Sequence, residues 1–292
     1  MARKSSKQQA EEAVLDLKGK LRQLNKALAG KGATIAENDP LVATIKAVEG
    51  MKAQAVVMTI FKPLQFWGFT DESFPPMRIA EGYKNANLSS CFAQNVALKS
   101  LPTIENIDVA VNLSSFASSC GALKEASLGA LTNATDISRA FSDCSSLTSV
   151  SIGAAPKMKE ASFLFSGCRS LKDVSIDLSG GLLANFSYAF FQCTSLRRVT
   201  GIIDLSSATS VPTPFQGCSS LEEVRIKGLK TDLDLSACVK LSMDSVRYLL
   251  EHVQTVSGGR IDLSRKLLEA NEEALGDIGD TASDKGWTIN YK

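Results

Sequence analysis

Cysteine is the residue type whose spacing first suggests chemistry. Six of the seven cysteines stand three residues before a leucine of a recurring motif: Cys120, Cys144, Cys168, Cys193, Cys218 and Cys238. In a small secreted chain such a count would suggest disulfides or a metal site. The regular spacing instead predicts a column of small buried thiols. Rungs of a stacked array lie about 4.8 Å apart, too far for a disulfide, whose Cβ atoms prefer about 3.8 Å. Asn95 takes this position in the first repeat, where we expect its amide to bond to backbone.

No other residue pattern indicates catalysis. His252 is the single histidine, so a Ser-His-Asp or Cys-His site would have to form around it. The glycine pairs Gly180-Gly181 and Gly258-Gly259 are turn signals, and no glycine-rich phosphate loop follows a strand. We therefore expect no catalytic residue, no metal ligand and no cofactor, and we expect that the protein is not an enzyme.

The elements that would position these cysteines come from one repeated motif. Residues 141–152 read FSDCSSLTSVSI, residues 165–176 read FSGCRSLKDVSI and residues 215–226 read FQGCSSLEEVRI. The motif leucines recur every 24 or 25 residues, at Leu98, Leu123, Leu147, Leu171, Leu196 and Leu221. This period lies in the leucine-rich-repeat range. It predicts an α/β solenoid over residues 85–240, with a parallel sheet and, from apolar spacings of three to four residues, one helical turn per repeat.

Each predicted strand reads Leu-x-x-Val-x-Ile, and its x positions point outward. The charged residues at these positions form a candidate protein-contact face: Lys124, Glu125, Lys172, Asp173, Arg197, Arg198, Glu222, Glu223 and Arg225. The third outward column holds Ser127, Ser151, Ser175, Thr200 and Arg225. No aromatic residue stands among them, which makes the face a poor carbohydrate platform. The face is either simply solvated or binds another protein.

The N-terminal segment carries a heptad pattern. Apolar residues alternate at steps of four and three, at Ala10, Val14, Leu17, Leu21, Leu24 and Leu28. This pattern predicts a coiled-coil stalk over residues 1–32 that holds a homo-oligomer together. The alternative is a single helix packed on a neighbouring domain. The a and d residues do not decide between two and three strands.

Two further units flank the predicted array. Residues 33–84 read as a linker helix starting at Pro40, then a β-rich N-terminal cap with a strand over 55–61 and the aromatic cluster Phe66, Trp67, Phe69 and Phe74. That cluster either seals the end of the array or binds a ligand. Residues 241–292 read as a C-terminal cap, with a helix capped by Ser242, a strand at 260–263, a second helix and a strand at 286–289.

Composition excludes several functions. The formal net charge is +1 and the hydrophobic content is 44%, which gives no footprint for nucleic acid and no polybasic membrane anchor. No apolar run approaches the roughly 18 residues that would span a bilayer. The N-terminus lacks the uninterrupted apolar core of a signal peptide. We therefore expect synthesis and folding in a cytoplasm.

The phrases AFSDCSSLTSVSI and FSGCRSLKDVSI resemble the BspA-like, or Treponema-type, leucine-rich repeat over residues 86–240. That family forms solenoids used for adhesion and protein contact. The heptad helix with GKGATIA after it resembles the N-termini of phage fibre and virion proteins, and the tail LSMDSVRYLLEHV…DKGWTINY resembles repeat proteins of gut bacteriophages.

These resemblances imply a bacteriophage virion structural protein, a capsid or tail fibre assembled in the host cytoplasm. The implied partners are a second and third copy of the chain (a homotrimer, with a dimer as the alternative), other virion proteins at the N-terminal end, and a host surface receptor. The trimer follows from the likeness to phage fibres. The alternative function is a bacterial surface leucine-rich-repeat adhesin at the cell surface.

Overall fold

The structure is a computed structural model that describes residues 58–60, 72–74 and 76–292. The predicted stalk, with its residues from Ala10 to Leu28, and the predicted linker helix lie outside the described residues. The expected strand over 55–61 appears as β1 (Met58–Ile60). Phe74, the described member of the aromatic cluster, packs on Phe92 of the core with ring centroids 5.2 Å apart. The other three members lie outside the described residues.

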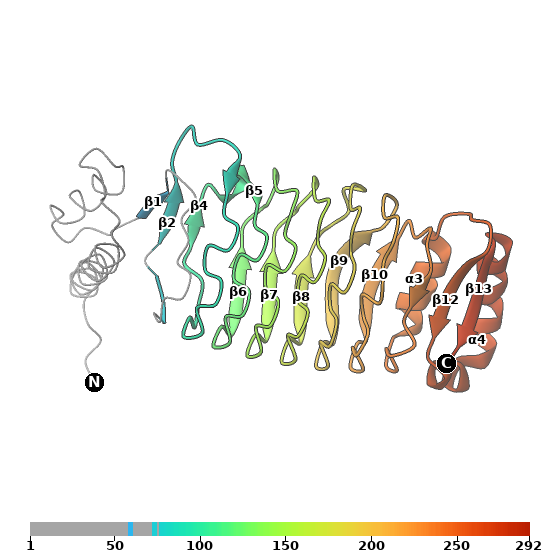
Figure 1. The fold of residues 1–292 in the computed structure, drawn as a ribbon. Coiled ribbons are helices and arrows are strands. Elements are labelled where there is room, and N and C mark those ends of the chain that lie inside the picture. Colours follow the sequence, from blue (N-terminus) through green and yellow to red (C-terminus); the bar gives the residue numbers. More distant parts are fainter. Residues whose placement is uncertain (1–57, 61–71, 75) are drawn as a thin grey trace, which may run out of the picture.

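Repeats stack side by side into an elongated solenoid (Figure 1). One parallel sheet runs along it in the order β10-β9-β8-β7-β6. We call this face the strand side. Its strands are β6 (Glu125–Leu128), β7 (Ser149–Ile152), β8 (Asp173–Ile176), β9 (Arg198–Asp204) and β10 (Glu223–Lys227). The predicted parallel sheet is therefore confirmed.

Alternation of side chains explains these strands. In β7 the buried residues are Val150 and Ile152, which with Leu147 point into the core, whereas Ser149 and Ser151 face outward. Strands alternate sides with a period of two, so one face of each strand is buried and the other is wet. Because β6, β7 and β8 keep this pattern in register, and β9 and β10 continue it up to a shift after Val199, their apolar residues merge into one continuous core.

The opposite wall of the solenoid, which we call the turn side, does not contain the helical turn that we expected in each repeat. Its segments are 88–95, 113–120, 137–144, 161–168, 186–193 and 211–218, and all of them form turns rather than helix. Every fourth residue has a positive φ, as at Arg139 (55°), Asp143 (60°) and Phe163 (55°). Alternate N–H groups donate to the next rung: Phe165 N–H reaches Ala189 O at 2.7 Å. A helix would bond these groups within the segment, so spacing alone misassigned it.

Columns of side chains between the two sides fill the core. One column consists of phenylalanines that stack from Phe141 to Phe215, with 5.3 Å between the ring centroids of Phe190 and Phe215. The seven cysteines are free and buried. Asn95 is fully buried, but neither polar atom of its side chain finds a partner among the described residues, so the expected bond to backbone is not found there.

The C-terminal unit holds the two helices and two strands expected after residue 240. They are α3 (Met243–His252), β12 (Gly259–Leu263), α4 (Arg265–Asp284) and β13 (Trp287–Tyr291). The strand β11 (Leu233–Asp234), which the sequence analysis did not expect, pairs with β12. Ser242 caps α3 by accepting from Ser245 N–H. Helix α3 lies along the edge of β10 and accepts hydrogen bonds from its backbone. Val224 N–H of β10 donates to Ser245 Oγ at 3.1 Å, and Gly228 N–H, just after the strand, donates to His252 O at 2.8 Å.

The N-terminal end has a different pairing. Strands β1, β2 (Met77–Ile79) and β4 (Ile104–Glu105) form a separate parallel sheet in the order β1-β2-β4. A short 3-10 helix η1 (Ile107–Val109) follows β4, and β3 (Ala86–Asn87) pairs with β5 (Ala110–Asn112). Between this sheet and β6 the structure records one bridge, Ser100 to Glu125.

Candidate functional site: the strand face

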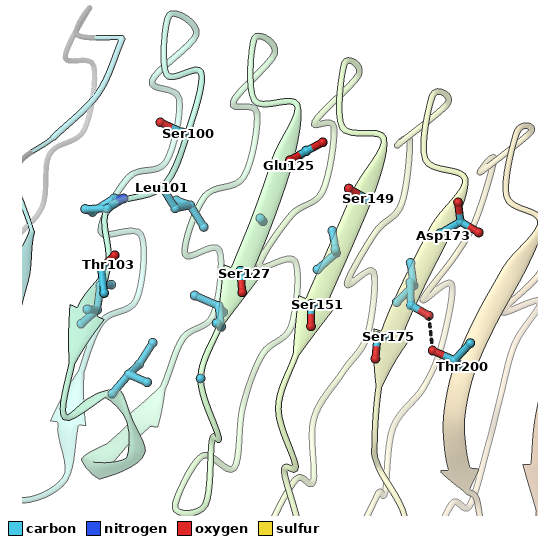
Figure 2. Close-up of a pocket in the computed structure, with 18 of the residues that line it drawn as sticks. Ser100, Leu101, Thr103, Glu125, Ser127, Ser149, Ser151, Asp173, Ser175 and Thr200 are labelled. Carbon is cyan, nitrogen blue, oxygen red and sulfur yellow. Dashed lines mark hydrogen bonds between the residues drawn. The ribbon is translucent and has the colours of Figure 1, made fainter. Parts of the chain in front are cut away.

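Four hydroxyl side chains form a row across the strand side. Ser127 pairs with Ser151, Ser151 with Ser175, and Ser175 with Thr200, one from each of four neighbouring strands. All four are exposed, and Figure 2 shows them aligned across the sheet. Thr200 Oγ1 donates to Val174 O at 3.3 Å. We call this row the hydroxyl stripe, and it can offer donors and acceptors to a bound polar group.

A second row, closer to the start of the strands, is charged. In register it holds Glu125, Ser149, Asp173, Arg198 and Glu223. Arg198 Nε donates to Asp173 Oδ1 at 2.8 Å, and this hydrogen bond raises the pKa of the guanidinium above its ordinary value. Asp173 and Arg198 are therefore joined to each other across β8 and β9.

Four other residues of the predicted contact face lie one position earlier in the sequence than the charged row. Lys124, Lys172, Arg197 and Glu222 stand just before the strands, and Arg197 forms an ion pair with Glu222 at 3.2 Å. Both pairs are about half exposed, and such pairs contribute little stability because water screens them. The structure thus brings all nine predicted contact residues to the strand side, and it joins four of them in two ion pairs.

Arg225 stands apart from the hydroxyl stripe, where the sequence pattern had aligned it with Thr200. The register shifts between β9 and β10, so that Val199 pairs with Val224 but Ile203 pairs with Ile226. Three residues of β9 therefore face Arg225 alone, which is a β-bulge. Gly201 within it has φ 97°, and a Cβ there would overlap the carbonyl of Ile176.

A hollow of about 700 Å³ lies on this face and extends from Ser100 to Arg198 and Thr200 on β9. The hydroxyl stripe lines it on one side, and Leu101, Pro102 and Ile107 line the other (Figure 2). Proline has no N–H for a ladder bond, and the chain at Pro102 leaves β6 and pairs with β2 instead, with Met77 opposite Ile104. The hollow has polar and apolar walls and lies open on the sheet.

The far end of the strand side carries aromatic and basic side chains that the sequence analysis missed. The guanidinium of Arg225 lies 5.6 Å from the ring centroid of Tyr248 on α3. Tyr248 stacks on His252 at 4.2 Å. A signal was present, since Tyr248 and His252 are four residues apart on one helix face. Only the placement of α3 beside β10 brings them to Arg225.

The turn side carries its own surface cluster. Arg139 lies over Phe163 at 4.6 Å, Phe163 stacks on Tyr188 at 4.8 Å, and Phe191 meets Tyr188 edge-on. The ring faces of Phe163 are covered by its neighbours, which leaves ring edges rather than flat platforms.

The cysteines are not suited to nucleophilic chemistry. Burial raises the pKa of Cys168 and Cys218 to about 12, and the thiolate is the reactive form. The thiols of the six motif cysteines instead donate hydrogen bonds to backbone carbonyls, as Cys168 Sγ does to Phe141 O at 3.0 Å and Cys193 Sγ to Phe165 O at 3.1 Å.

Short Asn-x-Ser and Asp-x-Ser motifs have a structural explanation. Asn112 Oδ1 accepts from Ser114 N–H at 2.8 Å and Asp136 Oδ1 from Ser138 N–H at 2.8 Å. These are Asx turns, and they open the turn side in most repeats. The motif was readable in the sequence and would have signalled turns there.

Within the described residues, no group of three or more His, Cys, Asp or Glu side chains is placed to hold a metal ion. Over the same residues, no helix combines the length and the apolarity that crossing a membrane requires.

Comparison with known proteins gives one match. No curated protein and no solved structure matches the chain. The model of the BspA type leucine rich repeat region matches residues 110–239 in six copies. The matched residues run from β5 through β11 and include the whole strand side. Residues 110–239 thus carry BspA-type leucine-rich repeats, and the candidate contact face lies on them.

Proposed function

We propose that the repeat array is a protein-contact module that binds its partner on the strand side and has no catalytic role. The observation that carries this proposal is the open face itself: nine charged residues lie in or just before its strands, and the hydroxyl stripe on β6 to β9 lines a hollow of about 700 Å³. The repeat match supports contact or adhesion as the role of such an array.

A charge reversal tests the face. Changing Arg197→Glu and Arg198→Glu breaks both ion pairs and reverses two charges in the middle of the strand side. We expect the affinity for the partner to fall at least tenfold. Because salt screens charges, the difference in affinity between the unmodified protein and the variant should become smaller at high salt. Arg260→Glu is the matched control, since Arg260 is about half exposed and pairs with Asp232 in the C-terminal unit. Unchanged binding in the double variant would mean that the face is only solvated.

We propose that the array is displayed on a bacteriophage virion, as part of a capsid or tail fibre. The support is the likeness of both chain ends to phage virion and gut-phage repeat proteins. The repeat match suits a bacterial surface adhesin equally well. Mass spectrometry of purified virions separates the two carriers. Peptides of this chain in virions are expected, and their presence on host cells with absence from virions would favour the adhesin.

We also propose that residues 10–28 hold a homotrimer, with a dimer as the alternative. The support is the apolar heptad seam from Ala10 to Leu28, since exposing each leucine to water costs roughly 1.5–3 kcal/mol. Changing Leu17→Asp and Leu24→Asp should give a monomer with a folded array, measured by light scattering and circular dichroism. A monomeric unmodified protein at high concentration would assign the segment to an intramolecular or docking helix.

A further inference from the structure

The C-terminal end of the strand side carries a cluster that we call the basic corner: Arg225, Tyr248 and His252. Strand β10 supplies the arginine and helix α3 the other two. Tyr248 lies between them, with the guanidinium 5.6 Å from its ring centroid and the imidazole stacked on it at 4.2 Å. The corner lies beyond β9 at the C-terminal end of the face, and none of its three residues lines the hollow.

Backbone contacts hold the corner in place. His252 Nδ1 lies 2.8 Å from Tyr248 O. Because a carbonyl oxygen only accepts, this nitrogen carries the proton and Nε2 is left for another partner. The carbonyl of His252 in turn accepts from Gly228 N–H at 2.8 Å, which fixes the end of α3 to the chain just after β10.

Charge distinguishes Arg225 from the other arginines of the strand side. Arg197 pairs with Glu222 and Arg198 with Asp173, and the nearby Lys227 pairs with Asp204 at 3.0 Å. Arg225 is exposed and forms no ion pair within the described part of the chain; its contact is the face of Tyr248. Cation–π contact orients a guanidinium without neutralising it, so Arg225 keeps its charge and its hydrogen-bond donors for a ligand.

We propose that the basic corner binds the carboxylate of an acidic residue, in an extended segment of a protein partner that lies along the strand side. A guanidinium recognises a carboxylate with two parallel hydrogen bonds. The hydroxyl stripe then faces the main chain of the segment, and the hollow beside Leu101 and Ile107 receives an apolar residue. This inference rests on the proposed function, and it adds the chemistry of the partner.

The spacing of the face sets the length of that segment. Five strand intervals separate Ser100 from β10. At about 4.8 Å each they span about 24 Å, which an extended peptide covers with about seven residues at about 3.3 Å per residue. The apolar residue and the acidic residue of the partner should therefore stand about seven positions apart.

His252 makes the test direct, because it is the single histidine of the chain and its imidazole signals are unambiguous by NMR. The probes are the peptide Ac-LTSTSTSE-NH2 and the same peptide ending in Gln. We expect the Glu peptide to shift the His252 signals and to bind roughly tenfold more tightly, since hydrogen bonds between a guanidinium and a carboxylate are stronger than those to a neutral amide.

Variants assign the effect to the corner. Arg225→Ala should abolish the preference for Glu over Gln, whereas Arg260→Ala, which removes the same charge outside the strand side, should preserve it. Equal affinity of the two peptides, absence of binding, or binding that leaves the His252 signals unmoved would each overturn the proposal. If charge reversal of Arg197 and Arg198 weakens partner binding but Arg225→Ala does not, the strand side remains a contact face and the basic corner is dropped.

Discussion

On both long sides of the array, hydrogen bonds join neighbouring rungs, but the backbone conformation differs between the two sides. On the strand side the chain is extended, and alternate side chains point outward and stay available for contact. On the turn side alternate N–H groups also bond to the next rung, but every fourth residue has a left-handed backbone. Left-handed positions cost most side chains about 1–2 kcal/mol. The strand side can therefore accept many residue types at its outward positions. The turn side is restricted, at every fourth position, to residues that tolerate a left-handed backbone.

The two sides also end differently toward the C-terminus. Helix α3 covers the edge of β10 on the strand side. On the turn side, the last rung is shorter than the one before it. Cys238 follows Leu235 by three residues, whereas in the previous rung Cys218 follows Val211 by seven. The N–H groups of Thr213, Phe215 and Gly217 consequently find no acceptor within the described chain, unlike those of Tyr188, Phe190 and Gln192 one rung earlier.

The largest predicted effect compares core positions of the two sides. Phe165 stacks between Phe141 and Phe190 on the turn side, and Val174 packs under the strand side. Phe165→Ala should lower the free energy of unfolding by about 3–5 kcal/mol and Val174→Ala by about 2 kcal/mol. Urea unfolding checks both values. An equal or larger loss at Val174 would contradict the view that the phenylalanine column dominates the core.

A second comparison places alanine at one glycine on each side. At Gly201, in the bulge of β9, a Cβ would overlap the backbone carbonyl of Ile176, and Gly201→Ala should cost about 2–4 kcal/mol. At Gly167, on the turn side, the Cβ would meet the movable end of the Asp143 side chain. Gly167→Ala should therefore cost about 1–2 kcal/mol, chiefly from its φ of 78°. Thermal unfolding that ranks Gly167→Ala as the more harmful would reject this explanation.

The same substitution should have opposite signs on the two sides. Ser119 has φ 59° on the turn side, at a position that is glycine in two other rungs. Ser119→Gly should stabilise the protein by about 0.5 kcal/mol, because glycine adopts this backbone readily. Ser151 lies in the middle of β7, where Ser151→Gly should destabilise by about 0.5–1 kcal/mol. Denaturant midpoints of matched samples measure both, and equal signs would contradict the comparison.

The smallest predicted effect is on stability at low pH, at the point where β9 leaves the strand side. Burial alone would raise the pKa of Asp204, but hydrogen bonds from Ser206 and Lys227 outweigh it and hold that pKa below its ordinary value of 3.8. The folded state thus binds this proton less readily than the unfolded state. The stabilisation is fully present above pH 3.8 and is lost as the pH falls through the lowered pKa. Asp204→Asn should flatten the pH dependence of unfolding in this window, and an unchanged acid transition would exclude Asp204 as a contributor.

Local spacing made much of the strand side predictable. The leucine period located the five strands from β6 to β10, and the alternation of residues such as Ser149, Val150 and Ser151 gave their outward and inward faces. The charged residues of the candidate contact face followed from the outward positions of the repeated motif. Ser242 was recognisable as the cap of α3 because capping depends on residues within one turn.

The turn side and the basic corner were decided by tertiary structure. Apolar residues three to four positions apart, such as Ala161, Leu164 and Phe165, fit a helix and a stack of turns equally well, and only the bonds to the next rung distinguish them. Pro102 gave no sign of which strand the chain would join, and the bulge at Gly201 depends on the rung beside it. The sequence by itself determined the repeat, its strands and their exposed residues, because these depend on neighbours along the chain. The hollow and the meeting of Arg225 with Tyr248 depend on which segments lie side by side, and only the folded chain decides that.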